Sequence, residues 1–328
     1  MNKETLRIIY MGTPDFAVAP LKSLIEGGYQ VVAVVTMPDK PIGRGMKMQG
    51  SPVKEYALQA GLKVLQPEKL KDEAFLEELR ALKADLQIVV AFRMLPEVVW
   101  NMPPMGTFNL HASLLPQYRG AAPIHWAVIN GEQETGVTTF LLKQEIDTGN
   151  ILLQRSLSIA PDETTGSVHD RLMAVGAALV PETVDLLLSG KAEPVAQEQL
   201  QRGALKPAPK LFKENTRIDW RKSAAEIHDF VRGLCPWPSA WTEMDIRTAT
   251  PHGAKSERLA IKIHEVSVGA ELLPDGAVQS DGKHFIKVAC AGGACVSIDR
   301  LQVPGKKAMS AADWLRGFQQ KPEITLVP

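Results

Sequence analysis

The sequence predicts an α/β protein whose first domain is a doubly wound, mostly parallel sheet and whose second, smaller domain is a β-barrel. Short apolar runs such as "LRIIYMG" and "ADLQIVVAF" alternate with amphipathic segments over residues 6–190. This alternation is typical of parallel strands covered by helices, as in Rossmann-like folds. After residue 214, most apolar runs are short and are separated by turn residues, which favours a sandwich or a small, OB-like β-barrel.

The elements of the first domain follow one another along the chain. The first strand is expected at 6–12 and the first helix at 13–28, with Thr13 as its N-cap and Pro14 in its first turn. Further strands are expected at 29–36, 62–67, 84–92, 106–111, 136–142 and 149–159. Helical segments are expected at 51–61, 72–83 and 95–102, and a long final helix at 164–190.

The composition shift near residue 204 predicts a domain boundary. A first domain is expected at 1–203, a basic, proline-containing linker at 204–213 and a C-terminal β-barrel domain at 214–328. That last domain should contain one amphipathic helix at 223–234 and a second helix at 310–318.

Length, composition and missing motifs exclude several classes of protein. Of the 328 residues, 45% are apolar and 23% are charged, as in ordinary soluble proteins. No apolar run approaches the roughly 20 residues of a membrane span, and the start does not resemble a signal peptide. We therefore expect a cytoplasmic protein without a membrane partner, and a monomer. The turn after the first strand lacks G-x-G-x-x-G, and no P-loop follows a strand, so a dinucleotide or nucleoside triphosphate enzyme is not indicated.

Cysteine content and charge bear on possible ligands. The three cysteines are too few and too scattered for a disulfide framework or a zinc site, so we expect no metal.

From Lys206 onward there are 18 Lys and Arg against 14 Asp and Glu, a net charge of +4, while residues 1–205 carry −4. A basic C-terminal part can help to bind a polyanion, although ordinary fluctuation gives a similar charge difference.

Three polar residues form the candidate catalytic set. In "FNLH" at the end of a strand, Asn109 and His111 should point to the same face, where open α/β sheets bind ligands. If strand 136–142 lies beside this one, Asp147 in the following loop should come near His111. Asp147 can then hold the imidazole of His111 and support its charged form, and the Asn109 amide can donate a hydrogen bond to a developing oxyanion. No nucleophilic Ser or Cys accompanies them, because "ASLL" lacks the G-x-S-x-G elbow.

This set suits direct acyl transfer between two bound substrates, but each residue also has a structural interpretation. A histidine at a strand end is often only a hydrogen-bond partner within the fold, and an Asp before Thr-Gly is often only a turn residue. The residues alone leave both interpretations open.

The stretch around this set resembles the formyltransferases that use 10-formyltetrahydrofolate. The family pattern is Asn-x-His followed by Ser-Leu-Leu-Pro, a basic residue with Gly, and later Asp-x-Gly. This chain meets it at Asn109, His111, Ser113–Pro116, Arg119-Gly120 and Asp147–Gly149. The likeness extends over residues 6–318. The insertion "TMPDKPIGRGMKMQGSPVK" and the C-terminal "IHDFVRGLCPWPSAWT" are similar to family members that act on methionyl-tRNA.

The resemblance implies an enzyme that formylates the free amine of initiator methionyl-tRNA for translation initiation, without a metal. Asn109 and His111 would stabilise the oxyanion, and Asp147 would manage the protons. The folate would lie against Ser113, Leu114, Leu115 and Pro116. The tRNA would be contacted by the loop 36–50, through Lys40, Arg44 and Lys47, and by Phe16. Phe16 has ordinary helix packing as an equal alternative, and the loop residues could simply be solvated.

One position departs from the family pattern, and three other functions compete. Arg93 in "VVAFRMLP" stands where the family usually has Gly, which bears on the nearby pterin contacts. A glycinamide-ribonucleotide formyltransferase would resemble only the first domain. A sugar-nucleotide formyltransferase would usually lack the basic loop. A nucleic-acid-binding protein with an inactive sheet domain would not need Asn109, His111 and Asp147 together.

Overall fold

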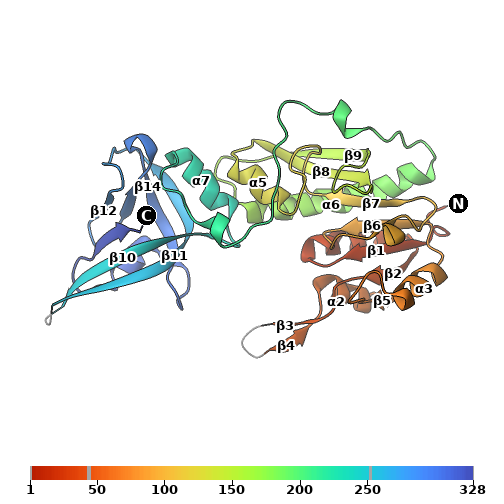
Figure 1. Ribbon diagram of the computed structural model, residues 1–328, viewed down its shortest axis with the longest axis horizontal. Helices are drawn as coiled ribbons and strands as arrows, with labels where there is room; N and C mark the ends of the chain where they lie inside the picture. Colours follow the sequence, from red (N-terminus) through yellow and green to blue (C-terminus); the bar gives the residue numbers. More distant parts are fainter. Residues whose placement is uncertain (1, 43–45, 251–252, 328) are drawn as a thin grey trace. The chain divides into compact units, whose positions relative to one another are not determined.

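The computed structural model describes residues 2–42, 46–250 and 253–327. The chain forms two compact units (Figure 1). Unit 1 consists of residues 1–123, 134–158 and 169–208, and unit 2 of residues 124–133, 159–168 and 209–328. Two short segments that interrupt unit 1 along the chain therefore belong to unit 2. The limits 1–203, 204–213 and 214–328 stay a prediction about functional domains.

Unit 1 is built on a seven-stranded sheet with the order β5-β2-β1-β6-β7-β8-β9. The first five strands in this order run parallel, and β8 is antiparallel to both β7 and β9. The predicted doubly wound, mostly parallel sheet is confirmed. Its strands are β1 (Ile8–Gly12), β2 (Val31–Val35), β5 (Val64–Leu65), β6 (Leu86–Val90), β7 (Thr107–His111), β8 (Glu134–Leu141) and β9 (Ile151–Ser158). A separate pair consists of β3 (Lys40–Ile42) and β4 (Lys47–Gln49).

Helices cover both faces of this sheet. Ile9 and Met11 of β1 pack with Leu79 on one face. On the other face α6 lies so close that a Cβ at Gly176 would be 2.8 Å from Leu110 Cδ2. The helices are α1 (Val18–Glu26), α2 (Pro52–Gln59), α3 (Glu73–Ala81), α4 (Glu97–Trp100) and α6 (Thr165–Leu188), with 3-10 turns η1 (Asp15–Ala17) and η2 (Gln197–Gln199). The first four residues of α6 belong to unit 2.

Unit 2 is built on an antiparallel sheet with the order β12-β13-β14-β11-β10-β16, and β15 pairs with β14. The outer strands β12 and β16 approach each other, so the sheet nearly closes into the predicted barrel (Figure 1). The strands are β10 (Ala240–Thr250), β11 (Gly253–Gly269), β12 (Val278–Ser280), β13 (Ile286–Ala289), β14 (Cys295–Gln302), β15 (Met309–Ser310) and β16 (Glu323–Leu326).

One helix face closes the core of unit 2. Ile227 and Val231 of α7 pack with Ile261, Ile263 and Val288 of the barrel, as the apolar periodicity of this segment predicts. The helices are α5 (Pro123–Ile129, in unit 2 except for Pro123), α7 (Ala224–Gly233) and α8 (Ala311–Leu315), with 3-10 turns η3 (Glu214–Thr216) and η4 (Ala291–Gly293).

Two local expectations are wrong. Thr13 does not cap a helix, because η1 comes first and α1 begins at Val18 with no side-chain cap. The Thr13 hydroxyl is buried and has no partner among the described residues. In unit 2, β10 and β11 have 11 and 17 residues, longer than the apolar runs suggested, because they keep pairing as an exposed hairpin beyond the core. Backbone pairing, which apolar patterning does not report, sets these strand lengths.

The first half of the predicted linker is attached to unit 1 through the loop that follows β7. The Tyr118 N–H donates to Lys206 O at 2.7 Å, and the Ala208 N–H donates to Arg119 O at 2.9 Å. The Ala121 N–H returns a hydrogen bond of 2.8 Å to Ala208 O. Residues 206–208 therefore hold the loop 118–121 from one side.

Within the part of the chain that the structure describes, no helix is both long and apolar enough to cross a lipid bilayer.

We expect Ser223→Ala to destabilise unit 2, because Ser223 and Glu226 form a reciprocal capping box at the start of α7. Loss of an N-cap costs about 0.5–2 kcal/mol. Denaturant unfolding followed by tryptophan fluorescence measures this loss of stability, because five of the six tryptophans, all but Trp100, lie in unit 2. Ser256→Ala, on an exposed part of β11, is the matched control and should leave the midpoint unchanged.

The same capping box predicts a pH dependence. Hydrogen bonds from the Ser223 N–H and hydroxyl lower the pKa of Glu226 to about 2 from its ordinary 4.5. A depressed carboxyl pKa stabilises the fold above pH 4.5, and this stabilisation is lost as the pH falls toward 2. The difference in unfolding midpoint between Ser223→Ala and the wild type should therefore shrink over this range. A difference that stays constant would contradict the role of Glu226.

Candidate active site

Strand β7 carries Asn109 and His111 on one face of the unit 1 sheet. Asn109 is aligned with Val89 of β6, and side chains alternate along a strand. Leu110, between them, lies on the opposite face beneath α6. The amide and the imidazole therefore share one face, as their spacing predicts.

His111 is bound by one nitrogen and faces a carboxylate with the other. It is 6% exposed, and its Nε2 lies 2.9 Å from the backbone O of Tyr118. Because a carbonyl oxygen only accepts, Nε2 carries the hydrogen. Nδ1 lies 3.8 Å from Asp147 Oδ2. A neutral imidazole thus turns an unprotonated nitrogen toward Asp147, and the carboxylate would stabilise a proton arriving at Nδ1.

Asp147 reaches His111 by a route that the sequence does not indicate. Strand β8 is antiparallel to β7, with Thr138 opposite His111 and Leu141 opposite Phe108. The chain leaves β8 beside Phe108, three residues or ~10 Å from His111. The loop 142–150 must therefore fold back across the sheet face to bring Asp147 to its observed place.

The backbone of the facing loop holds the Asp147 carboxylate. Gly120 donates its N–H to Asp147 Oδ2 at 3.0 Å. Asp147 itself has a φ of 54°, in the left-handed region that few residues other than Gly adopt and that Asp tolerates better than most. Gly120 has a φ of 127°, and a Cβ there would lie 2.4 Å from Ala208 O, so a side chain at position 120 would push the two segments apart.

The Asn109 amide is available to a ligand. Its side chain is half-buried, and among the described residues it has no hydrogen-bond partner. A donor of this kind beside an imidazole is the arrangement needed to stabilise an oxyanion.

The segment Ser113–Pro116 follows directly, and its polar groups are already used within the fold. The Ser113 hydroxyl donates to Gln117 O at 2.7 Å, and the Thr138 hydroxyl donates to Ser113 O at 2.6 Å. Leu115 and Pro116 are buried, and Leu114 is half-buried. The segment can therefore offer a ligand mainly apolar surface and backbone.

The loop 36–50 is only partly described. Lys40 is exposed in β3, Lys47 begins β4, and Arg44 lies outside the described residues. The base of this hairpin is fixed by Asp39, whose carboxylate pairs with Lys54 at 2.7 Å.

Phe16 is buried, with 6% of its surface exposed. Its ring lies at a tilt against His169 of α6, with 5.3 Å between the ring centroids. This burial agrees with the helix-packing alternative for Phe16.

Arg93, the departure from the family pattern, is bound to backbone, and it also lines a pocket of unit 1 with Leu70 and Leu95. Its guanidinium donates to Glu68 O at 2.8 Å and to Pro67 O. Partial burial lowers the pKa of Arg93. The side chain therefore ties the loop after β6 to the loop after β5.

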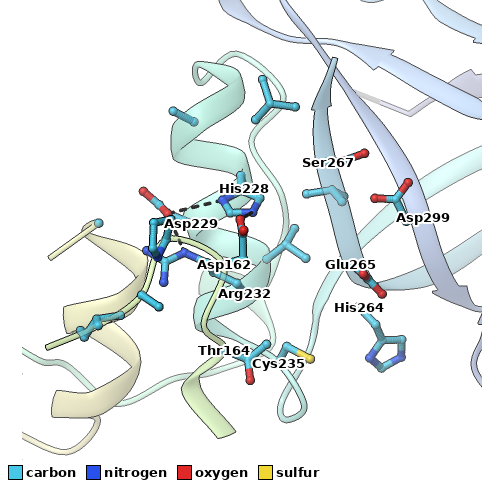
Figure 2. Close-up of a pocket in the computed structure, with 18 of the residues that line it drawn as sticks. Asp162, Thr164, His228, Asp229, Arg232, Cys235, His264, Glu265, Ser267 and Asp299 are labelled. Carbon is cyan, nitrogen blue, oxygen red and sulfur yellow. Dashed lines mark hydrogen bonds and ion pairs between the residues drawn. The ribbon is translucent and has the colours of Figure 1, made fainter. Parts of the chain in front are cut away.

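A groove of 1510 Å³ lies in unit 2, and none of the residues above lines it. Figure 2 shows its two walls, with His228, Asp229 and Arg232 on α7 facing Glu265 and Asp299 on the barrel. Five carboxylates and two arginines line it, a net charge of −3 before the histidines are counted. Burial, together with Glu265, raises the pKa of Asp299. A groove of this charge disfavours a nucleic acid backbone, and the described residues contain no metal-binding group of three or more His, Cys, Asp and Glu side chains.

Sequence reasoning missed the residue that joins the two loops of the site, Gln197. It is fully buried, and it bonds Arg119 on one side and Asp147 on the other. It lies in a polar stretch, "AQEQLQRG", about fifty positions from Asp147, and neither its type nor its spacing signals a role.

Comparison with known proteins supplies the context for this geometry. The family model described as Formyl transferase matches residues 6–184, and the one described as Formyl transferase, C-terminal domain, matches residues 210–319. The chain is 59% identical over 331 residues to the methionyl-tRNA formyltransferase of Parabacteroides distasonis, covering 99% of this chain and 100% of the relative. It is 51% identical over 324 residues to that of Porphyromonas gingivalis, covering 97% of each.

A solved structure shares the fold at lower identity. It is the N-formyltransferase from Helicobacter canadensis in complex with folinic acid and dTDP-3-aminofucose, with a TM-score of 0.65 and 20% identity. The match covers 90% of this chain and 99% of that one. At this identity the likeness supports the fold alone.

Proposed function

We infer that this chain, which belongs to the formyl transferase family, transfers a formyl group from 10-formyltetrahydrofolate to the free amine of methionyl-tRNA. The single observation that carries the proposal is the placement of Asn109, His111 and Asp147 on one sheet face, with His111 3.8 Å from Asp147. It supports this function because the chain is 59% identical along its whole length to a methionyl-tRNA formyltransferase. The formylated initiator tRNA would serve translation initiation in the cytoplasm, and we expect the enzyme to act as a monomer.

The reaction moves one proton and one formyl group. The amine nitrogen attacks the formyl carbon, and a tetrahedral intermediate with an oxyanion forms. The bond between that carbon and N10 of the folate then breaks, N10 takes up a proton, and the amine nitrogen loses one. A free α-amine has a pKa of about 7.7–8.0, so a base that removes its proton is useful near neutral pH.

The three residues divide these tasks by geometry. The Asn109 amide has no protein partner among the described residues and donates to the oxyanion. Because Nε2 of His111 is engaged by Tyr118 O, only the charged form of His111 has a proton on Nδ1, on the side facing Asp147, with which to stabilise the oxyanion. Asp147 stabilises the charged imidazole and accepts the amine proton, directly or through a water molecule, and the same proton is returned to N10 as the bond between N10 and the formyl carbon breaks.

The formyl donor would bind beside Ser113–Pro116. The half-buried Leu114 and the backbone of this segment suit an aromatic ring system with polar edges. Ser113 would support the segment through its hydroxyl rather than contact the folate, because that hydroxyl already donates to Gln117 O. No metal takes part in this proposal.

The tRNA would be bound by basic and aromatic side chains near the start of unit 2. The Lys210 Nζ lies 5.4 Å from the centroid of the Phe212 ring, which is 56% exposed. The Lys213 Nζ lies 5.0 Å from the centroid of the Trp241 ring. Among the described residues neither lysine has an acidic partner. Unpaired cations beside aromatic rings are suited to phosphates and unstacked bases.

The test of the proposed function is formyl transfer by the purified chain. With 10-formyltetrahydrofolate as donor, the chain should formylate methionyl-tRNA and leave uncharged tRNA and amino-sugar nucleotides unmodified. Efficient formylation of an amino-sugar nucleotide without activity on methionyl-tRNA would replace this proposal by the sugar-nucleotide alternative.

We expect Asp147→Asn and His111→Ala each to lower kcat by at least about 100-fold, the usual effect of losing a general base or a group that stabilises an oxyanion. Single-turnover rates with saturating substrates measure the chemical step. Asp185→Asn is the matched control, because this carboxylate lies on α6 and is bound to the Tyr29 hydroxyl at 2.6 Å. A normal single-turnover rate in either site variant would remove that residue from the mechanism.

We expect Lys210→Ala combined with Lys213→Ala to raise KM for methionyl-tRNA and to leave KM for the folate unchanged. Each lysine that binds a phosphate adds about 1 to the slope of log K against log salt, so the slope for the double variant should be smaller by about 2. The control is Lys283→Ala with Lys321→Ala, two exposed lysines elsewhere on unit 2. Equal salt slopes for the two double variants would refute this tRNA surface.

Arg44 is proposed to read the shape of the tRNA rather than only its charge. A guanidinium binds phosphate with two hydrogen bonds or stacks on a base, which an ammonium cannot match. We therefore expect Arg44→Lys to lower kcat/KM for methionyl-tRNA nearly as much as Arg44→Ala does, while folate binding stays intact. Near-native values for both variants would show that Arg44 has no role in recognition.

A further inference from the structure

The candidate active site depends on a loop that is hydrogen-bonded to the sheet near its two ends, where the Leu142 N–H donates to Thr107 O and Asn150 O accepts from the Leu141 N–H. The loop 142–150 leaves β8 beside Phe108 and folds back over the sheet face. Its Asp147 adopts a φ of 54°, which carries a conformational cost for a residue with a side chain. Asp147 therefore needs contacts from outside its own loop to stay near His111.

Gln197 supplies these contacts with both ends of one amide. Its Nε2 donates to Asp147 O and to Gly149 O, each at 2.8 Å. Its Oε1 accepts from Arg119 Nε at 3.0 Å and from Arg119 Nη2 at 2.6 Å. The side chain is fully buried, so all of its hydrogen-bonding capacity is spent inside the protein.

These bonds close a ring around the site. His111 bonds to Tyr118 O, in the same loop as Arg119 and Gly120. Gly120 bonds to the Asp147 carboxylate, and Arg119 reaches the backbone of Asp147 through Gln197. The loop 118–120 thus sets the distance between the His111 imidazole and the Asp147 carboxylate. It bonds the imidazole once, through Tyr118 O, and it is joined to Asp147 twice, through the Gly120 N–H and through Arg119 with Gln197.

The chain around Gln197 is anchored on both sides. Val195 exchanges two backbone hydrogen bonds with Ile151 of β9, of 2.8 and 2.9 Å. Ala208 pairs with the backbone of residues 119–121. Gln197 therefore lies on a segment that is fixed to β9 on one side and to the loop 119–121 on the other.

We propose that Gln197 is a positioning residue for the transfer reaction, acting through Asp147. It does not bond His111 or the Asp147 carboxylate, so it would not take part in proton transfer. Its task is to keep the Asp147 loop folded over the sheet so that the carboxylate faces Nδ1 of His111. This inference rests on the proposed function, since it requires Asp147 to act in catalysis.

Substitutions at position 197 can separate the two halves of the amide. Gln197→Glu keeps the length and the acceptors for Arg119, but it loses both hydrogen bonds to the backbone of the Asp147 loop. Gln197→Met keeps the length and loses all four bonds. Because a displacement of about 1 Å can cost 10²-fold in rate, we expect both variants to lower kcat by about 10- to 100-fold. KM for either substrate should stay within about twofold.

A double-mutant cycle with Asp147→Asn distinguishes positioning from general weakening of the fold. If Gln197 acts through Asp147, then Gln197→Met or Gln197→Glu should cost little further rate once Asp147→Asn is present. The matched control is Gln117→Met. Gln117 also binds the 202–206 segment, at Ala204 O and the Lys206 N–H, but it does not touch the Asp147 loop. Any reduction of kcat by Gln117→Met should therefore multiply with the reduction caused by Asp147→Asn, as expected for independent sites.

The outcomes separate this inference from the proposed function. Rate reductions from Gln197 and Asp147 substitutions that multiply would overturn the positioning role, as would a kcat for Gln197→Glu equal to that of the wild type. If Gln197→Met does not fold, as judged by its thermal unfolding, the cycle with Gln197→Glu decides in the same way. Absence of formyl transfer by the wild-type chain, or full activity of Asp147→Asn, would instead refute the proposed function.

Discussion

The hydrogen bond from the Gly120 N–H to the Asp147 carboxylate is the contact on which the site depends. The topology of the sheet would leave these two loops apart, because β8 runs antiparallel to β7 and its exit lies beside Phe108. The bond needs a backbone N–H that a carboxylate can approach closely, and Gly120 allows this where a side chain would collide with Ala208 O. Much of what surrounds the site secures this approach.

The catalytic geometry is therefore built by three separate pieces of chain. Strand β7 orients Asn109 and His111, the loop after it presents Tyr118 O and the Gly120 N–H, and the segment from Val195 to Ala208 fastens both loops. Buried polar groups hold a site well only when every partner is satisfied. Gln197 meets that condition with four hydrogen bonds, which is why a buried amide at this position is compatible with stability.

Charge is arranged differently on two surfaces of unit 2. The groove between α7 and the barrel gathers carboxylates, and burial of Asp299 there raises its pKa. The end of the predicted linker instead places Lys210 and Lys213, which have no acidic partner among the described residues, beside the rings of Phe212 and Trp241. A net charge of +4 for the C-terminal part hides this contrast. Of these two surfaces the second suits a polyanion, so the location of charge, rather than its sum, restricts where a tRNA can bind.

The alternation of apolar strands and helices, the barrel that follows them and the shared face of Asn109 and His111 could all be read from the residues. These features follow from the spacing of side chains along single strands and helices, and this spacing is the same in the sequence and in the folded chain. Asp147 could be added to the pair Asn109 and His111 on the condition that strand 136–142 lies beside their strand, and family resemblance added the transferred group. The direction of β8, the return of the Asp147 loop, the anchoring of Arg93 to Pro67 and Glu68, and the role of Gln197 could not be read in this way. Each depends on hydrogen bonds between residues far apart in the chain, and such bonds leave no periodic trace in the sequence because only the folded backbone brings their donors and acceptors together.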